Sequence, residues 1–382
     1  MLVKDKKIAI VGGGPGGLTL ARLLQMKGAQ VTVYERDAHK DVRVQGATLD
    51  LHEPSGLEAL KRAGLLEEFY KHYRPEAGKL RIIDTAGYIH HDEHEGIDSF
   101  AEDRPEIDRG PLRHILMNAL LPDTIIWDSQ FISMQEEGQG WILKFKNGHS
   151  AYADLVIAAD GAHSRIRPYI TDIQPVYSGI TIVEGTIYNA ALNAPDIYAL
   201  VQGGKVFALS GDQSLILSTK GDGSLSFYTG TAETEDWLQT AAIDFSNKHQ
   251  VHRWFIKRFH DWSAFWHELF ASDEVFFIPR PQYHFPPDQH WSPKSNVTML
   301  GDAAHRMPPY AGEGVNMAMQ DAYELAESLT GQEFTDIQSA IAVYETQMCQ
   351  RAARVTEQTL YNTQMLHSEG ALSNILKIMQ GA

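Results

Sequence analysis

Three glycines near the start of the chain have the spacing of a turn that binds nucleotide phosphates. Gly12, Gly14 and Gly17 lie between a strand-like apolar run over residues 8–11 and a helix-like run over residues 18–24. In this G-x-G-x-x-G pattern the first glycine allows a tight turn, the second lets a pyrophosphate approach the backbone, and the third permits close helix–strand packing. The diphosphate would lie on the N–H groups of the helix N-terminus. The residues predicted to form this turn are Gly12, Gly14, Pro15, Gly16 and Gly17.

An acidic residue closes the next predicted strand. Residues 31–34 are apolar or β-branched, and Glu35 follows them, 18 residues after Gly17. A carboxylate at this distance can bind the ribose hydroxyls of an adenosine. A glycine-rich turn without a ligand is the alternative, but it leaves the strand before the turn, the helix after it and the acid without a purpose.

Two further strands end in aspartate. Asp160 follows the apolar run 155–159, and Asp302 follows the run 296–300. Ligands of open α/β sheets bind at the carboxyl ends of the strands, so we expect these aspartates to join the glycine turn at one edge. A single nucleotide phosphate needs only one of these positions. FAD would use all of them, with its adenosine at Glu35 and its ribityl hydroxyls at Asp302.

A loop rich in proline and glycine, residues 306–314, follows Asp302 and leads into a predicted helix over residues 315–326. Backbone N–H groups at the start of a helix stabilise negative charge, including that of a reduced flavin ring. We therefore expect the ring to meet this loop. The residues predicted to contact it are Pro309, Gly312, Gly314, Val315 and Asn316.

Two arginines, Arg109 and Arg113, share one face of a helix predicted within residues 105–121, since they are four residues apart. Adjacent cations of this kind suit a diphosphate or an internal acid. Ordinary surface arginines are the alternative.

Other candidate groups are weaker. Ser164 beside His163 lacks the surroundings of a hydrolase nucleophile, so no catalytic triad is predicted. His305 could serve as a general base, but the prolines near it favour a structural loop residue. Tyr310 fits a core aromatic or a substrate wall equally well. The histidine- and acid-rich residues 90–95 lack a clear metal-ligand set, which favours a solvated loop.

The elements around these residues predict an α/β fold. It consists of a Rossmann-like FAD-binding domain of the glutathione-reductase type, an antiparallel-sheet substrate domain and a long C-terminal helix. Residues 175–230 alternate as strands do, and residues 332–369 contain neither glycine nor proline. The predicted boundaries are 1–70, 101–172 and 280–331 for the FAD-binding domain, 71–100 and 173–279 for the substrate domain, and 332–382 for the bridging helix.

Size and charge limit the functions available. A chain of 382 residues exceeds the usual single core. The net charge of −16 argues against nucleic acids and anionic membranes as partners. Cys349 is the only cysteine, so no internal disulfide or cysteine-based zinc site is expected. With no apolar signal segment and no run of 18 apolar residues, we expect a soluble, cytoplasmic monomer.

The motifs together resemble the single-component, FAD-dependent aromatic hydroxylases. The residues that carry this resemblance are Gly12 to Gly17, Tyr34-Glu35-Arg36, Asp160-Gly161 and Gly301-Asp302-Ala303-Ala304-His305. Within that family the chain most resembles the tetracycline-inactivating flavin monooxygenases. That likeness lies in Thr48-Leu49-Asp50-Leu51-His52, Ala63-Gly64-Leu65-Leu66, Pro105-Glu106-Ile107 and Met307-Pro308-Pro309.

The resemblance implies two cofactors, FAD and NADPH. NADPH reduces the flavin and leaves, dioxygen adds to the reduced flavin as a hydroperoxide, and its distal oxygen attacks an electron-rich phenol or enol carbon. No side chain acts as a nucleophile in this chemistry. Arg43 matches a position assigned to NADPH. The other residues whose positions suit FAD are Glu35, Arg36, Asp50, Arg109, Arg113, Asp160 and Asp302.

The expected substrate positions are Glu184, Lys205, Ile216, Ser226, Tyr310 and Leu366. They depart from the tetracycline enzymes, which have Gln, Arg, Phe, His, Phe and Met at these places. Lysine for arginine loses bidentate geometry, and glutamate for glutamine adds a charge. The implied substrate is therefore a polycyclic phenolic compound of the tetracycline type, with another aromatic or polyketide metabolite as the alternative. A flavoprotein halogenase lacks support because no Gly-Trp-x-Trp motif is present. A plain NAD-dependent dehydrogenase would leave Asp160 and Asp302 without a purpose. A non-catalytic flavin or drug binder is disfavoured by the intact set of three cofactor sites, and turnover of NADPH would exclude it.

Overall fold

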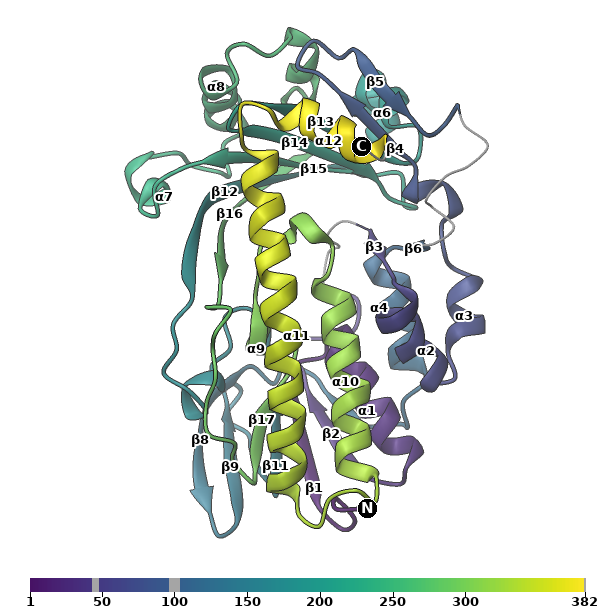
Figure 1. Cartoon of the computed structure of the whole chain (residues 1–382), viewed down its shortest axis with the longest axis vertical. Coiled ribbons are helices and arrows are strands. Elements are labelled where there is room, and N and C mark those ends of the chain that lie inside the picture. The colour runs from purple at the N-terminus through teal and green to yellow at the C-terminus, as the bar shows by residue number, and fades with distance from the viewer. Residues whose placement is uncertain (43–47, 96–103, 381–382) are drawn as a thin grey trace.

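The computed structural model describes residues 1–42, 48–95 and 104–380. Two sheets lie one above the other along its long axis, and one long helix runs beside both (Figure 1). The lower sheet is parallel throughout. Its strands, in spatial order, are β17 (Val297–Met299), β11 (Leu155–Ala158), β1 (Lys7–Val11), β2 (Gln30–Tyr34) and β7 (Ile125–Ile126).

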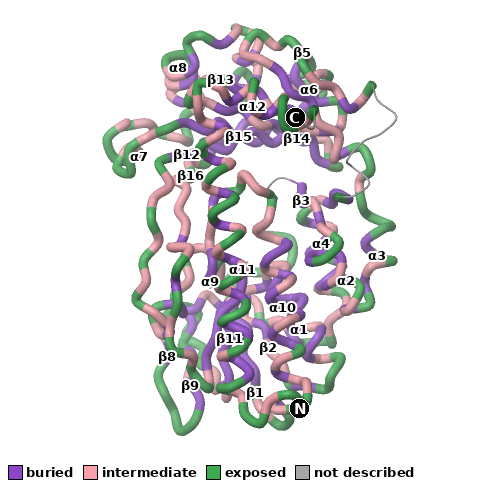
Figure 2. The backbone as a smooth tube through the Cα atoms, in the orientation of Figure 1, coloured by how far each residue is buried: buried purple, intermediate pink, exposed green. Residues whose placement is uncertain are grey.

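The lower sheet is covered by helices because its central strands are apolar on both faces, as buried parallel strands are. All four residues of β11 and the last four of β1 are buried. Figure 2 shows this buried core around β1, β11 and α10. The helices of this part are α1 (Pro15–Met26), α2 (Glu58–Arg62), α3 (Leu66–Tyr70), α4 (Arg109–Asn118), α9 (Asp302–His305) and α10 (Gly314–Thr330), with the short π-helix η1 (Glu53–Leu57) and 3-10 helix η4 (Arg167–Tyr169).

The upper sheet has seven strands and is antiparallel except where β13 runs parallel to β4. Its strands, in spatial order, are β16 (Val275–His284), β12 (Val176–Ile187), β15 (Leu225–Ala232), β14 (Gln213–Thr219), β13 (Lys205–Ser210), β4 (Leu80–Ile83) and β5 (Ile89–Asp92). Two small sheets complete the fold: β10 (Ser150–Ala153), β9 (Gly140–Phe145) and β8 (Phe131–Glu137) form one, and β3 (Leu49–Asp50) and β6 (Glu106–Ile107) the other.

One face of the upper sheet packs on its own helices. Val183, Val206, Leu217 and Phe227 belong to a buried cluster that also contains Phe255 of α8. Since side chains alternate along a strand, the residues between them point to the opposite face. The helices on this side are α5 (Ala190–Asn193), α6 (Pro195–Val201), α7 (Trp237–Thr240), α8 (Lys248–Arg258) and the 3-10 helix η5 (Ala264–Phe270).

The long helix α11 (Ile337–Leu366) begins at Asp336, whose side chain accepts a hydrogen bond from the Ser339 N–H at 2.8 Å. Near its start the Tyr344 hydroxyl donates to the Met299 carbonyl of β17 at 3.0 Å. Its last residue, Leu366, is buried in a cluster with residues of β4 and β13. The predicted long helix is therefore present and contacts both sheets, and α12 (Ala371–Met379) follows it.

One local prediction was wrong in part. Residues 90–92 belong to β5, which pairs with β4, so half of the loop predicted over residues 90–95 is a strand held by backbone hydrogen bonds. The segment 175–230, predicted to consist largely of strands, does so, but it also contains helices α5 and α6, whose Ala190 and Ile197 are buried beneath the sheet.

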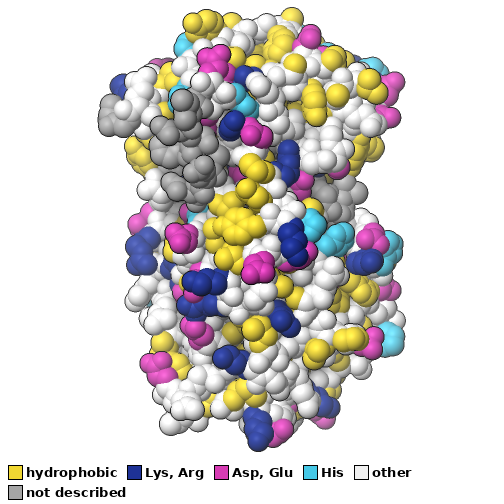
Figure 3. Space-filling model, turned by 90° about the vertical axis from the view of Figure 1, so that its right-hand side faces the viewer, with side chains coloured by type: hydrophobic (Ala, Val, Ile, Leu, Met, Phe, Trp, Pro, Cys, Tyr) yellow, Lys and Arg dark blue, Asp and Glu magenta, His cyan; other side chains and the backbone are white. Residues whose placement is uncertain are grey.

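The surface and the helices add two observations. On the face that carries α3, acidic and basic side chains are interspersed (Figure 3), so the negative charge does not gather in one patch there. Among the described residues, no helix combines the length and the apolar character that crossing a membrane requires.

Candidate cofactor and substrate site

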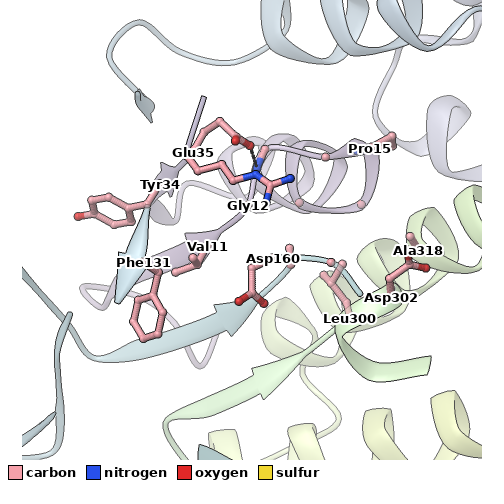
Figure 4. Close-up of a pocket in the computed structure, with 18 of the residues that line it drawn as sticks. Val11, Gly12, Pro15, Tyr34, Glu35, Phe131, Asp160, Leu300, Asp302 and Ala318 are labelled. Atoms are coloured by element: carbon pink, nitrogen blue, oxygen red, sulfur yellow. Dashed lines mark hydrogen bonds between the residues drawn. The ribbon is translucent and has the colours of Figure 1, made fainter. Parts of the chain in front are cut away.

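The carboxyl ends of β2, β1, β11 and β17 open into one cavity of about 300 Å³. These four strands are neighbours in the sheet, so the glycine turn, Glu35, Asp160 and Asp302 meet as predicted for parallel strands. Figure 4 shows Glu35, Asp160 and Asp302 around this cavity. The predicted residues that line it are Gly12, Gly14, Pro15, Gly16, Gly17, Glu35, Arg36, Arg109, Asp160, Asp302, Gly314 and Val315.

The glycines of the turn have different physical requirements. Gly12 has φ +116°, and a Cβ there would clash with the Ala159 carbonyl. A Cβ on Gly17 would clash with the Gly12 carbonyl. Gly14 has an ordinary extended backbone, and no described protein atom lies within 4 Å of an added Cβ. The fold itself therefore requires Gly12 and Gly17, whereas Gly14 leaves open space beside the cavity.

Glu35 shapes the turn as well as lining the cavity. Its buried carboxylate accepts hydrogen bonds from the Gly13 N–H at 2.6 Å and from the Asp37 N–H at 3.0 Å. The acid thus holds the glycine turn against the end of β2. Its predicted contact with a ribose stays a prediction.

One carboxylate oxygen of Asp160 has no hydrogen-bond partner among the described residues. Its Oδ2 accepts from the Arg165 N–H at 2.8 Å, but its buried Oδ1 has no hydrogen-bond partner among the described residues. Burial raises the pKa of this carboxyl group. A buried acceptor without a partner is costly, so the site suits a ligand that carries a hydroxyl donor.

The two arginines of α4 have separate positions. Arg109 lines the cavity. Arg113 is buried and instead donates to Asp37 at 3.1 Å, to the Lys40 carbonyl at 3.1 Å and to the Gly13 carbonyl at 3.4 Å. Of the two uses that the spacing suggested, Arg113 serves the internal acid, and it does not line the cavity.

Asn316 is buried and fastens the start of α10 to the segment after β3. Its Oδ1 accepts from the His52 N–H at 2.9 Å and the Gly56 N–H at 3.3 Å, and its Nδ2 donates to the Asp50 carbonyl at 2.9 Å. The side chain is thus a clamp, and it does not line the cavity. At this helix start, Gly314 and Val315 line the cavity instead.

A charged cluster lies beside this clamp. Asp50, which does not line the cavity, is 3.2 Å from His52 Nε2, and Glu313 is 3.3 Å from His52 Nδ1. Burial alone would lower the pKa of His52, but the two carboxylates raise it to about 9. Burial would raise the pKa of Asp50, but His52 and Lys205 hold it below its usual value. Of the other loop residues, an added Cβ on Gly312 would lie 3.2 Å from Asp50, and Pro309 is exposed.

His52 should therefore stabilise the protein only while it is protonated. Replacing it by glutamine should cost about 1–2 kcal/mol at pH 6, the usual value of hydrogen bonds to charged groups. Because the folded-state pKa is raised, this advantage is complete below about pH 6.5 and is lost as the pH rises through about 9. Urea unfolding of both proteins from pH 6 to 10 measures it. The control His72→Gln, at an exposed ion pair, should cost under about 0.5 kcal/mol. A His52→Gln deficit that stays constant with pH would contradict the assignment.

The turn that carries Asp302 depends on a residue that no motif indicated. Asp321 of α10 is fully buried and accepts from the Gly301 N–H at 2.8 Å, from His305 at 2.6 Å and from Arg351 at 2.6 Å. His305 is therefore a structural residue rather than a general base. Spacing could not reveal this network, since its members are 16 to 30 residues apart and meet only when α10 and α11 pack.

The substrate positions predicted on strands share the face of the upper sheet opposite its helices. Two rows of paired residues cross that face. Lys205, Ser218, Ser226 and Thr186 form one row. The other row consists of Phe207, Ile216, Tyr228 and Glu184.

The charged members of these rows are already paired. Lys205 forms an ion pair with the buried Glu106 of β6, and Glu184 pairs with Arg280 of β16. The buried hydroxyls of Ser218 and Ser226, by contrast, have no hydrogen-bond partner among the described residues. These two neighbouring hydroxyls are therefore available to bond a ligand.

Tyr310 and Leu366 border the same face. The Tyr310 hydroxyl lies 3.3 Å from His367 Nε2, which also lies 3.0 Å from the Ser214 hydroxyl of β14. Burial raises the pKa of Tyr310. Leu366 is buried among residues of β4, β13 and α12, and Tyr310 packs against that cluster. Tyr310 is thus both a core contact and a wall of this face.

A family model described as an FAD binding domain matches residues 5–284 and 289–359. The chain belongs to this FAD-binding family. A relative is monooxygenase penA of Penicillium thymicola, 27% identical over 434 residues that cover 98% of each chain. The family resemblance drawn from the motifs is confirmed, and the protein is an FAD-dependent monooxygenase by family.

Solved structures share the fold of this FAD-dependent monooxygenase. Tetracycline destructase Tet(55) matches with a TM-score of 0.79 and 20% identity, over 100% of this chain and 96% of its own. HpxO of Klebsiella pneumoniae, in complex with FAD and uric acid, matches with a TM-score of 0.77 and 21% identity, over 99% of this chain and 93% of its own. The predicted α/β fold with an FAD-binding domain is therefore confirmed.

The residues present fit FAD. The open space at Gly14, the unpaired Oδ1 of Asp160 and the exposed Asp302 offer room for a diphosphate and acceptors for hydroxyl groups. Arg36 and Arg109 supply positive charge at the same cavity. Arg43, predicted to contact NADPH, lies outside the described residues. Within the described part of the chain, no group of three or more His, Cys, Asp or Glu side chains could hold a metal ion.

Proposed function

We propose that this FAD-dependent monooxygenase consumes NADPH and hydroxylates an electron-rich phenol or enol carbon of a polycyclic aromatic compound, with tetracycline-type antibiotics as the first substrates to test. Bound FAD supplies the redox and oxygen chemistry, and the chain's own residues bind, orient and exclude water. The observation that carries the proposal is the sheet face whose paired rows contain Ile216 and Ser226 and which Tyr310 borders.

We further propose that residues 71–100 and 173–279 form the substrate-binding part, that Arg43 contacts NADPH, and that the chain acts as a monomer. The name of Tet(55) supports a tetracycline substrate, but its identity of 20% extends only to the fold. The sheet face itself provides the stronger evidence on substrate class. Its aromatic and aliphatic side chains, Phe207, Ile216 and Tyr310, suit a flat apolar ring system.

Hydroxylation of another aromatic or polyketide metabolite is the second candidate. The ion pairs Lys205–Glu106 and Glu184–Arg280 favour it, because both charged positions that would contact a tetracycline are engaged within the protein. A substrate that bonds to the serine hydroxyls would need neither charge.

The first experiment measures NADPH oxidation by the purified yellow protein with and without tetracycline, followed by mass analysis of the drug. Faster NADPH use and a product heavier by one oxygen atom would support tetracycline as a substrate. NADPH use without modification of the drug would move the search to other polycyclic phenols. No NADPH or NADH oxidation with any phenolic compound would contradict the monooxygenase proposal and favour a non-catalytic flavin or drug binder.

Asp302→Ala should release the flavin, because the carboxylate lines the cavity at the end of β17 and is exposed to a ligand. We expect FAD to bind at least about tenfold more weakly, or 1.4 kcal/mol. The control Asp172→Ala, another exposed aspartate outside the cavity, should bind FAD normally. Absorbance of the purified proteins and titration with FAD measure the effect. A fully flavinylated Asp302→Ala protein would show that this carboxylate does not hold the cofactor.

Ser226→Ala should weaken substrate binding without weakening the fold. The hydroxyl is buried and makes no hydrogen bond within the described protein, so its removal costs no internal contact. We expect an unchanged or higher melting temperature, unchanged FAD binding and a KM for the identified substrate raised about fivefold. An unaltered KM would remove Ser226 from the substrate site.

A further inference from the structure

A second cavity, of about 520 Å³, lies between helix α11 and the segment that joins β16 to β17. Its walls are residues 287–293 and the side of α11 between Ala342 and Ala353. It shares no lining residue with the cofactor cavity. Its volume falls within the range of small-molecule sites.

A buried carboxylate lines this cavity with one oxygen unused. Glu345 is 5% exposed, and its Oε1 accepts a hydrogen bond from the Thr298 hydroxyl at 2.7 Å. Its Oε2 has no hydrogen-bond partner of normal geometry among the described residues. The indole N–H of Trp291, which also lacks such a partner, lies close enough to the Glu345 carboxyl group to lower the pKa of that group. Buried polar atoms in native proteins are nearly always paired, so a ligand that donates to Oε2 with normal geometry would complete a pairing that the Trp291 N–H only approaches.

The charged residues around the cavity indicate which kind of donor group a ligand would carry. Asp288 and Glu345 line it, and the described lining includes no lysine or arginine. His290 also lines it, on the exposed segment. The nearby Arg167 lies 5.6 Å from the Trp291 ring and donates to the carbonyls of Ala303 and Ala304, outside the lining. Burial raises the pKa of Glu345 to about 7, and a bound cation would favour its ionised form.

We propose that this cavity binds a small organic amine. Its ammonium group donates to Oε2 of Glu345, and its apolar body lies against Trp291 and the proline and alanine side chains of the walls, including Pro287 and Ala342. An indole ring is the preferred aromatic partner of such cations. The site lies next to the FAD-binding part of the fold. Glu345 accepts a hydrogen bond from Thr298 of β17, and Gln289 donates to the Ala304 carbonyl of α9 at 3.0 Å.

Cys349 makes the test specific to this cavity. It is the only cysteine of the chain, it lines the cavity, and it is one helical turn from Glu345. The flavin-loaded protein is equilibrated with cystamine, bis(2-hydroxyethyl) disulfide or 3,3′-dithiodipropionate, each against increasing 2-mercaptoethanol. Thiol–disulfide exchange then attaches a two-carbon tether that ends in an ammonium, a hydroxyl or a carboxylate group, and mass analysis gives the labelled fraction.

We expect that removing the ammonium tether will require at least about tenfold more 2-mercaptoethanol than removing the hydroxyl tether. This ratio corresponds to about 1.4 kcal/mol. The carboxylate tether should be the weakest. Glu345→Gln should reduce the ammonium preference to within about twofold, whereas the control Glu357→Gln, an exposed acid farther along α11, should retain it. Equal retention of the three tethers, or a preference that persists in Glu345→Gln, would overturn the proposal.

A second measurement uses the unmodified chain, in case Glu345→Gln does not fold. Free benzylamine should compete with the ammonium tether and lower its labelled fraction, whereas benzyl alcohol at the same concentration should not. Equal effects of the two compounds would show that the cavity does not recognise an ammonium group. Neither readout depends on catalytic activity, so failure of the amine site is distinguishable from failure of the proposed monooxygenase function.

Discussion

Gly14→Ala is expected to abolish flavin binding while the protein stays folded. Gly14 has φ −81° and ψ 176°, which alanine adopts freely, and an added Cβ would meet no described protein atom within 4 Å. The methyl group would instead enter the cavity where a diphosphate approaches the turn. We expect FAD affinity to fall on the order of 100-fold, about 2.7 kcal/mol, with a melting temperature of the flavin-free protein close to that of the unaltered chain.

Gly12→Ala is the matched control because it should destabilise the fold, whereas Gly14→Ala should weaken only FAD binding. Its φ of +116° and the clash with the Ala159 carbonyl make any side chain destabilising. The expected loss is about 3–4 kcal/mol of the free energy of unfolding. Urea unfolding of the flavin-free proteins and FAD titration separate the two effects. Normal FAD binding by a folded Gly14→Ala protein would show that no ligand group approaches this turn.

Asp321→Ala is expected to give the largest loss of stability from a single side chain outside the cofactor cavity. The change leaves His305 and Arg351 without their buried partner and the Gly301 N–H without an acceptor. Removing one member of a buried ion pair typically costs about 3–5 kcal/mol. The variant should also bind FAD poorly, because Gly301 precedes Asp302 and has a φ of +59° that the hydrogen bond holds in place.

The pH dependence of this network has a definite sign. Burial alone would raise the pKa of Asp321, but His305 and Arg351 hold it below the usual value. Its stabilisation is therefore complete above the unfolded-state pKa near 3.9 and is lost as the pH falls through the lower folded-state value. The control Asp336→Ala removes only the cap of α11 and should cost about 1 kcal/mol. A deficit for Asp321→Ala no larger than that of the control would mean that the network is not a stabilising unit.

The local patterns of the chain were sufficient to locate the cofactor cavity. The apolar runs before Gly12, Asp160 and Asp302 predicted buried strands, and parallel pairing brings their carboxyl ends to one edge. That prediction succeeded because strand periodicity and glycine spacing are short-range properties. The long helix could be predicted in the same way, since the residues that form α11 contain no glycine or proline.

The roles of residues whose partners lie in other elements could not be predicted from the sequence. Arg113 proved to bond to Asp37 rather than line the cavity, and Asn316 proved to be a clamp. Residues 90–92 form a strand because they pair with β4. The composition of residues 90–95 does not indicate that pairing. In each case the deciding contact joins residues far apart in the chain or in a different element, so the local pattern leaves several outcomes equally favourable.

The sequence by itself determined the FAD-binding architecture and the family, because glycine spacing, apolar periodicity and the acids at strand ends are readable one segment at a time. Only the tertiary structure decided which charges remain available. Packing of the upper sheet against β6 paired Lys205 with Glu106, and packing of α10 against α11 enclosed Asp321 with Arg351. It also left Glu345 and Ser226 with unused polar atoms. Such pairing depends on distances across the fold, and spacing along the chain does not encode those distances.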